Sequence, residues 1–129
     1  MVFWDRALEH WAVWGVTTIY KICERVAWQE AEKLAHYRGS AVDHRDGFIH
    51  FSSAAQLGET AARHFAGQRD LMLVAVDAGA LGVALKWEAS RGGALFPHLY
   101  GTLPLAAVRW ARPLPDEIGG RRETGELEP

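Results

Sequence analysis

The order of apolar and polar positions predicts a strand followed by a helix in the first third of the chain. Residues 17–23 are mostly β-branched or aromatic, which is typical of a strand. Residues 24–38 place Glu and Lys on one helical face and apolar side chains on the other, namely Ala27, Ala31 and Leu34. Gly39 stands where a helix C-terminal cap is expected, and residues 39–47 predict a polar loop after it.

A second unit of strand and helix follows this loop. Residues 48–52 lie between a glycine and a helix start, so they predict a short strand. Ser53 and Gln56 have the spacing of a capping box, in which each side chain bonds to the backbone of the other residue. The helix that they begin is expected to run to about Phe65 and to bury Leu57, Ala61 and Phe65.

The remaining apolar segments complete a small sheet. Residues 71–76 form the most apolar run and are the best candidate for a central strand. Residues 78–81 predict a turn or short helix, residues 91–93 predict a mobile loop, and further strands are expected at residues 85–88, 96–101 and 108–112. The order of elements predicts an α+β domain, with a small split antiparallel or mixed sheet flanked by two main helices.

The two ends of the chain differ from this domain, which spans residues 17–113. Residues 1–16 form a tryptophan-rich extension with Trp4, Leu8, Trp11 and Trp14 near helical spacing. The extension is interpreted as a flanking helix, an oligomer contact or an upstream addition, and docking is favoured because tryptophan prefers burial. Residues 114–129 are charged and rich in Gly and Pro, so they predict a disordered or loosely attached tail.

Composition narrows the class of protein and its partners. Lys and Arg number 14 against 16 Asp and Glu, and this net charge of −2 gives no basic field that would recruit nucleic acid. The chain has no apolar run long enough for a membrane span and no secretory signal pattern, so a cytoplasmic protein without membrane contact is expected. Its single cysteine, Cys23, lies in an apolar strand and is interpreted as a buried, inert thiol rather than a nucleophile. The oligomeric state does not follow from the sequence.

Two short segments share an arrangement of side chains that predicts a polar site. Side chains alternate between the two faces of a strand, so Phe48, His50 and Ser52 share one face. Phe96, His98 and Tyr100 share a face of a later strand in the same way, so both segments offer a ring, a histidine and a hydroxyl. If the strands meet, two imidazoles that exchange protons near neutral pH would converge. The alternative for each histidine alone is a structural hydrogen bond in a half-buried strand.

Neighbouring residues extend this candidate site. Ser52 lies just before the N-terminus of the second predicted helix, where free N–H groups favour a phosphate or carboxylate beside His50. Glu88 is a candidate general acid or base. The alternative, which is the commoner case, is a solvated glutamate at a strand edge. The expected catalytic residues are therefore His50, Ser52, Glu88, His98 and Tyr100, and the expected ligand-binding residues are Asp46, Gly47, Phe48, Ser53, Gln56 and Phe96.

Standard cofactor and metal motifs do not account for these residues. The sequence lacks the phosphate-binding, dinucleotide-binding, zinc-protease and serine-hydrolase motifs. His44, His50 and Asp46 form a conceivable metal set, but their spacing matches no standard site, so no metal is expected. The sequence indicates no particular cofactor.

Several motifs together resemble a known family. They are Ile19-Tyr20-Lys21-Ile22, Trp28, Asp46-Gly47-Phe48-Ile49-His50-Phe51-Ser52 with Gln56, Trp87-Glu88, and Phe96-Pro97-His98-Leu99-Tyr100-Gly101. Their order and spacing over residues 17–113 resemble the bacterial domain-of-unknown-function family 952. The resemblance implies an ADP-ribosyltransferase-like fold, a split antiparallel sheet with helices packed around a cleft.

The same resemblance implies roles for particular positions. ADP-ribosyltransferases usually carry a histidine or arginine on a first strand, a tyrosine or serine on the next and a glutamate on a later one. Here the first position falls near Tyr20 or Lys21, which departs from the pattern, while Ser52 fits the second position and Glu88 would serve as the third.

Three hypotheses from different classes remain open on the sequence alone. The first is an enzyme that acts on a nucleotide-like or phosphorylated small molecule in a cleft lined by His, Ser and Tyr. The second is a non-catalytic module that holds a small anionic ligand in the same cleft. The third is an interaction protein that uses its N-terminal tryptophan segment.

Overall fold

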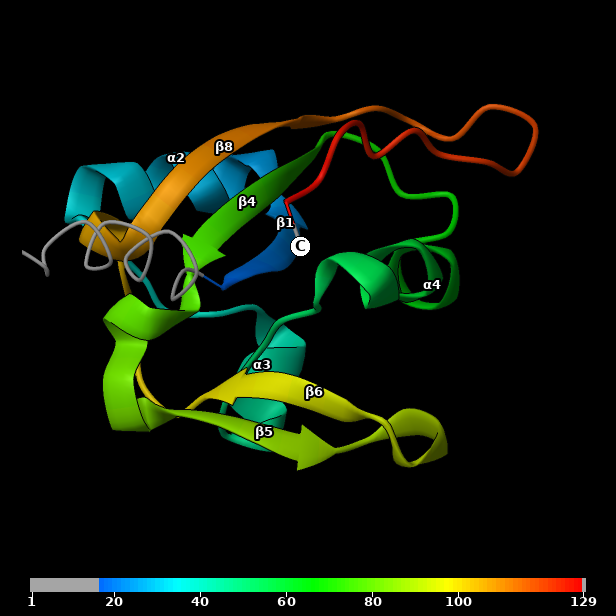
Figure 1. Ribbon diagram of the computed structural model, residues 1–129. Coiled ribbons are helices and arrows are strands. Elements are labelled where there is room, and N and C mark those ends of the chain that lie inside the picture. Colours follow the sequence, from blue (N-terminus) through cyan, green and yellow to red (C-terminus); the bar gives the residue numbers. More distant parts are fainter. Residues whose placement is uncertain (1–16, 129) are drawn as a thin grey trace, which may run out of the picture.

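The main sheet of the protein has three antiparallel strands in a computed structural model that describes residues 17–128. These strands are β1 (Thr18–Glu24), β4 (Leu71–Asp77) and β8 (Val108–Leu114), in the order β1-β4-β8 (Figure 1). The most apolar segment of the chain is therefore the central strand, as its composition predicts. Both faces of β4 are buried, with Val74 and Val76 in one apolar cluster and Leu73 and Ala75 in another.

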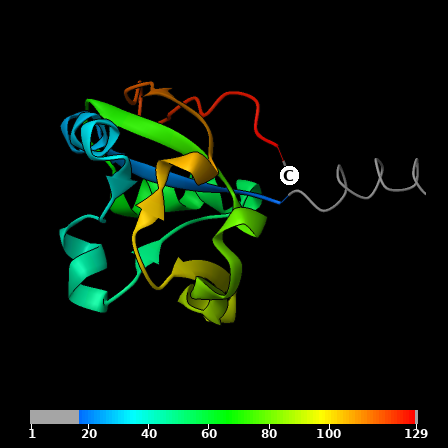
Figure 2. The same ribbon diagram turned by 90° about the vertical axis from the view of Figure 1, so that its left-hand side faces the viewer.

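A second small sheet holds the segments of the candidate site. Its strands are β3 (Ile49–His50), β6 (Leu95–Leu99) and β5 (Leu85–Ala89), in the order β3-β6-β5, again antiparallel. A backbone bridge between Tyr20 and Ser52 connects the end of this sheet to β1. The two short strands β2 (His36–Tyr37) and β7 (Leu103–Pro104) pair with each other. The protein is thus an α+β domain with small antiparallel sheets, shown from a second side in Figure 2.

The first long helix, α2 (Arg25–Leu34), is shorter than the pattern predicts. Ala35 adopts a left-handed backbone conformation with φ 65°, and the chain then turns into β2. The prediction of a helix to residue 38 is wrong because Tyr37 is buried as a strand residue beside β7, and this pairing outweighs the local helical pattern. Leu34 is exposed rather than part of the apolar face.

A short helix, α3 (Ala41–Asp46), occupies the segment predicted as a polar loop. Ser40 caps its first turn, and Asp43 completes a capping box by accepting a hydrogen bond from the Ser40 N–H at 2.8 Å. Gly47 ends the helix in a left-handed conformation with φ 86°, which glycine adopts without strain. A polar helix of this length carries no apolar stripe, so periodicity alone does not reveal it.

The second long helix, α4 (Ala54–His64), begins where the sequence predicts. Ser53 and Gln56 form both hydrogen bonds of the capping box. Leu57 and Ala61 are buried against the face of the main sheet that carries Tyr20 and Leu73. Within residues 17–128 there are also three 3₁₀ segments: η1 (Ala78–Ala84), η2 (Arg91–Gly93) and η3 (Leu105–Ala107).

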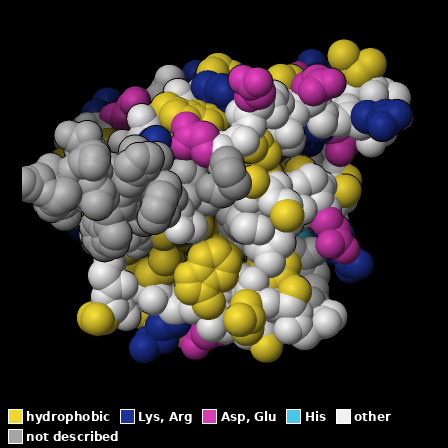
Figure 3. All heavy atoms as spheres, viewed as in Figure 1, with side chains coloured by type: hydrophobic (Ala, Val, Ile, Leu, Met, Phe, Trp, Pro, Cys, Tyr) yellow, Lys and Arg dark blue, Asp and Glu magenta, His cyan; other side chains and the backbone are white. Residues whose placement is uncertain are grey.

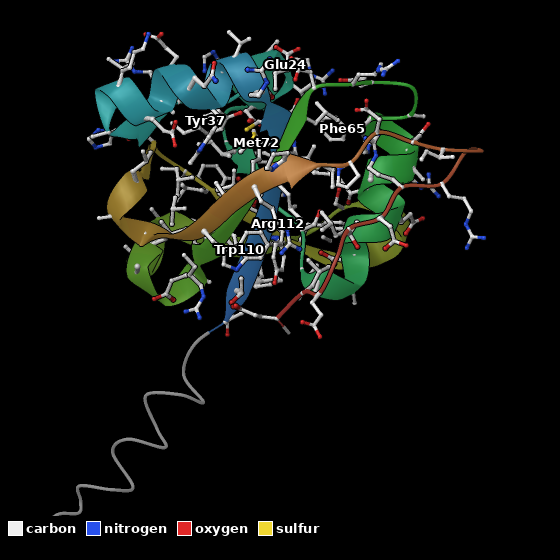
Figure 4. The ribbon with its side chains drawn as sticks, turned by 90° about the horizontal axis from the view of Figure 1, so that it is seen from above. Glu24, Tyr37, Phe65, Met72, Trp110 and Arg112 are labelled. Carbon is white, nitrogen blue, oxygen red and sulfur yellow. The ribbon has the colours of Figure 1, made fainter. Side chains whose placement is uncertain are left out.

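The C-terminal segment differs from the expectation of a loosely attached tail. After β8 the chain turns at Gly119 and Gly120, and residues 121–128 run back beside Trp110 and Arg112 (Figure 4). The side chain of Arg122 is 4% exposed, and its guanidinium donates to the carbonyl oxygens of Phe65 and Gln68. Few apolar residues are present here, but side-chain hydrogen bonds to backbone carbonyls attach the segment instead.

Two further expectations concern the termini and the membrane. The tryptophan-rich residues 1–16 lie outside the described residues, so their docking stays a prediction. Among residues 17–128, no helix has both the length and the apolar character to cross a bilayer.

Candidate functional site

The register of the second sheet brings the two histidines of the candidate site together. His50 on β3 and His98 on β6 are direct partners across the antiparallel pair, and their ring centroids are 5.6 Å apart. His98 is 5% exposed, whereas the side chain of His50 is 34% exposed. Paired residues point to the same face of a sheet, so the two imidazoles lie edge to face on one side of β3 and β6.

Phe48 is the centre around which the other rings are arranged. Its ring lies 4.0 Å from that of His98 in a stacked orientation and 4.6 Å from that of His50. The ring of Tyr100 is 5.3 Å away on the same cluster. These contacts fix the planes of both imidazoles, because a ring packed against Phe48 has little freedom to rotate.

Glu88 orients His98 through a direct hydrogen bond. The glutamate Oε1 lies 2.8 Å from His98 Nδ1, and it also accepts a hydrogen bond of 2.8 Å from the Tyr100 hydroxyl. These two hydrogen bonds, first that from His98, lower the pKa of Glu88. The bond to Glu88 raises the pKa of Tyr100, so the phenol keeps its proton. Glu88, His98 and Tyr100 thus form a linked acid, imidazole and phenol.

Two aspartates from α3 hold His50. Its Nδ1 lies 2.6 Å from Asp43 Oδ1, and its Nε2 lies 2.9 Å from Asp46 Oδ2. Carboxylates only accept hydrogen bonds, so both contacts form together only when the ring carries both protons. Asp43 was not among the predicted site residues; its signal in the sequence is the capping-box spacing with Ser40, which places it in a helix that faces His50.

Asp43 also forms a buried ion pair with Lys21 of β1. The lysine Nζ lies 2.8 and 3.0 Å from the two carboxylate oxygens, and both side chains are almost completely buried. Burial alone would raise the pKa of Asp43, but the hydrogen bond from His50 and the charge of Lys21 outweigh it and lower that pKa. Burial lowers the pKa of Lys21, and Asp43 opposes this shift. The side chain of Lys21 is therefore occupied inside the fold rather than free to contact a ligand.

Several predicted site residues lie elsewhere. The hydroxyl of Ser52 is buried and lies 2.8 Å from that of Thr60 on α4, so it does not face the histidines. Ser53 and Gln56 cap α4, and Gln56 Nε2 donates to the carbonyl oxygen of Leu95. Phe96 is buried on the histidine face of β6. The predicted anion site at this helix start is thus made of groups already bonded within the fold.

The sequence that carries these residues matches a known family. A family model described as "Protein of unknown function (DUF952)" matches residues 22–111, which include all the rings of the cluster. The chain belongs to the DUF952 family. No match is found among curated proteins.

Solved structures of one bacterial protein resemble this DUF952 chain. The crystal structure of protein CC0527 from Caulobacter crescentus is 50% identical, with a TM-score of 0.81 over 84% of this chain and 96% of that chain. The solution NMR structure of CC0527 is also 50% identical, with a TM-score of 0.72 over 81% of this chain and 90% of that one. The α+β architecture described above is therefore shared with this relative.

Lys86 is a further polar residue on the histidine face of the DUF952 domain. It is the direct cross-strand partner of His98, and Glu88 follows two residues later on the same face. The alternation of β5 indicates this position for Lys86, although Lys86 is not among the predicted site residues. The opposite face of the hairpin carries Trp87, which is 42% exposed, and hydrophobic side chains gather over β5 and β6 in Figure 3.

An open hollow of about 340 Å³ lies beside the cluster. Asp43 and Phe48 line it from the cluster side, together with Arg38, His44, Gly47, Ile49, Gly101 and Thr102. His50 and His98 do not line it, so this hollow is not the shared cavity that the sequence predicts. His44 Nε2 lies 2.9 Å from the Arg38 carbonyl oxygen. This ring nitrogen of His44 is therefore bonded to the backbone, whereas His50 bonds to Asp46.

This geometry supports proton transfer at His98. Glu88 occupies Nδ1, so the nitrogen left to exchange a proton with a substrate is Nε2. A carboxylate that orients an imidazole and stabilises its charged form is a recurring arrangement for a general base. Lys86, the cross-strand partner of His98, supplies a charged hydrogen-bond donor beside it, which suits an anionic group.

Proposed function

We propose that the protein is an enzyme that acts on a nucleotide-like or phosphorylated small molecule at the histidine cluster. In this proposal His98 accepts a proton from the attacking hydroxyl or water. Glu88 holds the imidazole in position, and Lys86 binds the anionic group of the substrate. Tyr100 and His50 orient Glu88 and His98 through their contacts with them. The observation that carries the proposal is the buried His98 ring, bonded at Nδ1 to Glu88.

The charge of Lys86 on the histidine face supports a phosphorylated substrate. Its ammonium is a cationic group on the strand residue directly opposite His98. Phosphate oxygens accept charge-assisted hydrogen bonds from an ammonium. The exposed ring of Tyr100 offers an edge on which a base or sugar could pack.

The arrangement of the sheets supports an ADP-ribosyltransferase-like fold as part of this proposal. Two antiparallel three-stranded sheets join at the bridge between Tyr20 and Ser52, as in a split sheet. The residues at the first-strand position are occupied, since Tyr20 bonds to Glu128 and Lys21 to Asp43. The proposal therefore assigns the chemistry to His98 and Glu88 rather than to the first strand.

A binding and turnover screen with the full-length protein tests this function. The probes are AMP, ADP, ADP-ribose, NAD and a sugar phosphate, with binding measured by calorimetry and turnover by phosphorus NMR. We expect at least one probe to be converted, and His98→Asn to reduce its turnover by about 100-fold or more, the usual range for general-base removal.

Matched variants separate catalysis from folding. Glu88→Gln keeps the shape of the side chain and should also reduce turnover, while His36→Asn changes an exposed histidine of β2 and should leave it unchanged. Melting temperatures of all three variants report folding. Full turnover in a folded His98→Asn protein, or a wild-type protein that binds none of the probes, would contradict the proposal.

A second candidate function is a non-catalytic module that binds a small anionic ligand. The observation that favours it is that Asp43, Asp46 and Glu88 all bond to groups of the protein itself, as in a structural network. Under this alternative the probes bind without being converted. The His98→Asn variant would then change the dissociation constant and no rate.

A further inference from the structure

The C-terminal segment is held by a set of side chains on the main sheet. We call this set the docking face; it consists of Thr18 and Tyr20 on β1 and of Arg109, Trp110 and Arg112 on β8. Figure 4 shows the segment passing Trp110 and Arg112 on the side of the sheet where α4 lies. The docking face belongs to the other sheet from the histidine cluster, so it is a separate site.

Glu128 makes the densest set of contacts with the docking face. Its carboxylate accepts hydrogen bonds from the Thr18 hydroxyl at 2.9 Å, the Arg109 Nε at 3.0 Å and the Trp110 indole at 3.4 Å. The bond from Thr18, followed by those from Trp110 and Arg109, lowers the pKa of Glu128. The Tyr20 hydroxyl donates to the Glu128 carbonyl oxygen and accepts from the Glu128 N–H. Side chain and backbone of this residue are thus both recognised.

Arg112 binds the backbone of the segment at two residues that precede Glu128. Its guanidinium lies 4.1 Å from the ring centroid of Trp110 and donates to the carbonyl oxygens of Thr124 and Glu126. A Cβ atom at Gly125 would lie 2.7 Å from the Arg112 Nη2, and the φ angle of Gly125 is +75°. The left-handed backbone favours glycine at this position, and an added Cβ would push the Arg112 guanidinium away from its carbonyl partners.

The two residues between Gly125 and Glu128 differ in their role. Leu127 packs against the apolar cluster that contains Tyr20, Leu57 and Leu114. Glu126 contributes its carbonyl oxygen to Arg112, and its side chain is exposed. The docking face therefore makes specific contacts with Gly125, Leu127 and Glu128. It makes none with the side chain of Glu126.

We propose that the docking face is a recognition site for an extended acidic peptide of the pattern Gly-x-Leu-Glu, and that residues 125–128 of the same chain are its occupant. Recognition by side chains, rather than by addition of a strand to the sheet edge, makes the site selective for sequence. A segment tethered by a short connection has an effective concentration of about 1 mM at its site. The chain's own segment therefore excludes free peptides of the same pattern unless its contacts are weakened.

A competition experiment with the full-length protein tests this inference. The probe is a fluorescein-labelled synthetic peptide with the sequence of residues 121–128, and binding is followed by fluorescence anisotropy. We expect the Glu128→Gln protein to bind the peptide at least about 10-fold more tightly than the wild-type protein, because the occupant is then easier to displace. A peptide with alanine in place of its glycine should bind the variant at least about 10-fold more weakly.

The chain offers a matched control two residues away. Glu126→Gln makes the same chemical change at a side chain that does not contact the docking face, so this protein should bind the peptide as weakly as the wild type does. A second variant, Gly125→Ala, should behave like Glu128→Gln. Equal binding by the Glu128→Gln and wild-type proteins, or equal binding of the glycine and alanine peptides, would overturn the proposal.

Discussion

At Asp43, one carboxylate accepts hydrogen bonds from three parts of the chain. Lys21 on β1, the Ser40 backbone N–H at the start of α3, and both the ring and the backbone of His50 all bond to it. Such a network is stabilising only while every member is satisfied. The position of His50, and with it one side of the histidine cluster, depends on this single residue.

Replacing Asp43 by Asn should therefore destabilise the protein strongly. The change leaves the Lys21 ammonium buried without its counter-charge, and loss of one partner of a buried ion pair costs about 3–5 kcal/mol. We expect a corresponding fall in the free energy of unfolding, measured by urea denaturation. Asp46→Asn alters an aspartate that is more exposed, so the same measurement should show a smaller fall.

The pH dependence of stability gives an independent check on Asp43. Its folded-state pKa is lowered, so its contribution is fully present above the ordinary carboxyl pKa of about 4 and is lost as the pH falls toward the folded value. The wild type should lose stability below pH 4 more steeply than Asp43→Asn does. Parallel acid profiles for the two proteins would show that the carboxylate is not charged in the folded state.

Cys23 should be chemically inert in the folded protein. The residue is buried in β1, and burial raises the pKa of its thiol to about 12. Almost no thiolate is present at pH 8, and the thiolate is the reactive form. We expect Ellman's reagent to modify Cys23 only in denaturant, measured by absorbance at 412 nm. Rapid modification of the native protein would instead show that the strand opens readily.

At the scale of elements, the sequence predicts those that form from their own local pattern. The strands β1 and β4 and the helix α4 follow directly from apolar runs and from the capping box at Ser53. The end of α2 and the presence of α3 do not follow in this way. Tyr37 leaves the helix because β7, which is far along the chain, pairs with it, and α3 is stabilised by the bonds of Asp43 rather than by an apolar face.

In the candidate site, too, some features follow from local sequence patterns and others depend on contacts between distant segments. Alternation in β3 and β6 predicts that His50 and His98 share a face with aromatic neighbours, and the register confirms that these residues are partners. Alternation does not say which element covers each side chain, so it places Ser52 with the site although the Ser52 hydroxyl bonds to Thr60 on α4. The pairing of Asp43 with Lys21 does not follow from the sequence, because it joins two segments that have no common local pattern.

The two helix caps provide a matched pair of variants. Ser40→Ala and Ser53→Ala each remove one capping hydrogen bond, and each should cost about 1 kcal/mol of unfolding free energy. Only Ser40→Ala loosens the helix that presents Asp43 and Asp46 to His50. We therefore expect the His50 ring signals in NMR spectra to shift in Ser40→Ala and to stay in place in Ser53→Ala. Equal shifts in both variants would contradict this separation.

At the scale of the whole molecule, residues 115–128 act as an added layer on the main sheet and α4. Arg122 bonds to the end of α4 and the loop after it, while Leu127 enters the apolar cluster beneath. This attachment joins both edges of the sheet, since Glu128 contacts β1 and β8 together.

Removal of residues 116–129 should consequently destabilise the fold. The truncated protein loses the buried Arg122 contacts and exposes part of the cluster under Leu127, so we expect a fall in melting temperature of more than about 5 °C. Differential scanning calorimetry measures this change. An unchanged melting temperature would restore the view of the segment as a loosely attached tail.

The pairing of β1 with β4 has a consequence for synthesis of the protein. Apolar residues on both faces of β1, including Ile19 and Ile22, are covered in the native state, yet their partner strand begins only at Leu71. A chain emerging from the ribosome therefore exposes the apolar side chains of β1 until β4 has been made. Because sheet pairing between distant segments is slow, this interval is when the nascent chain is most open to aggregation or to capture by a chaperone. Ribosome-bound chains halted before Leu71 should accordingly bind a chaperone such as trigger factor, and chains halted after Pro115 should release it.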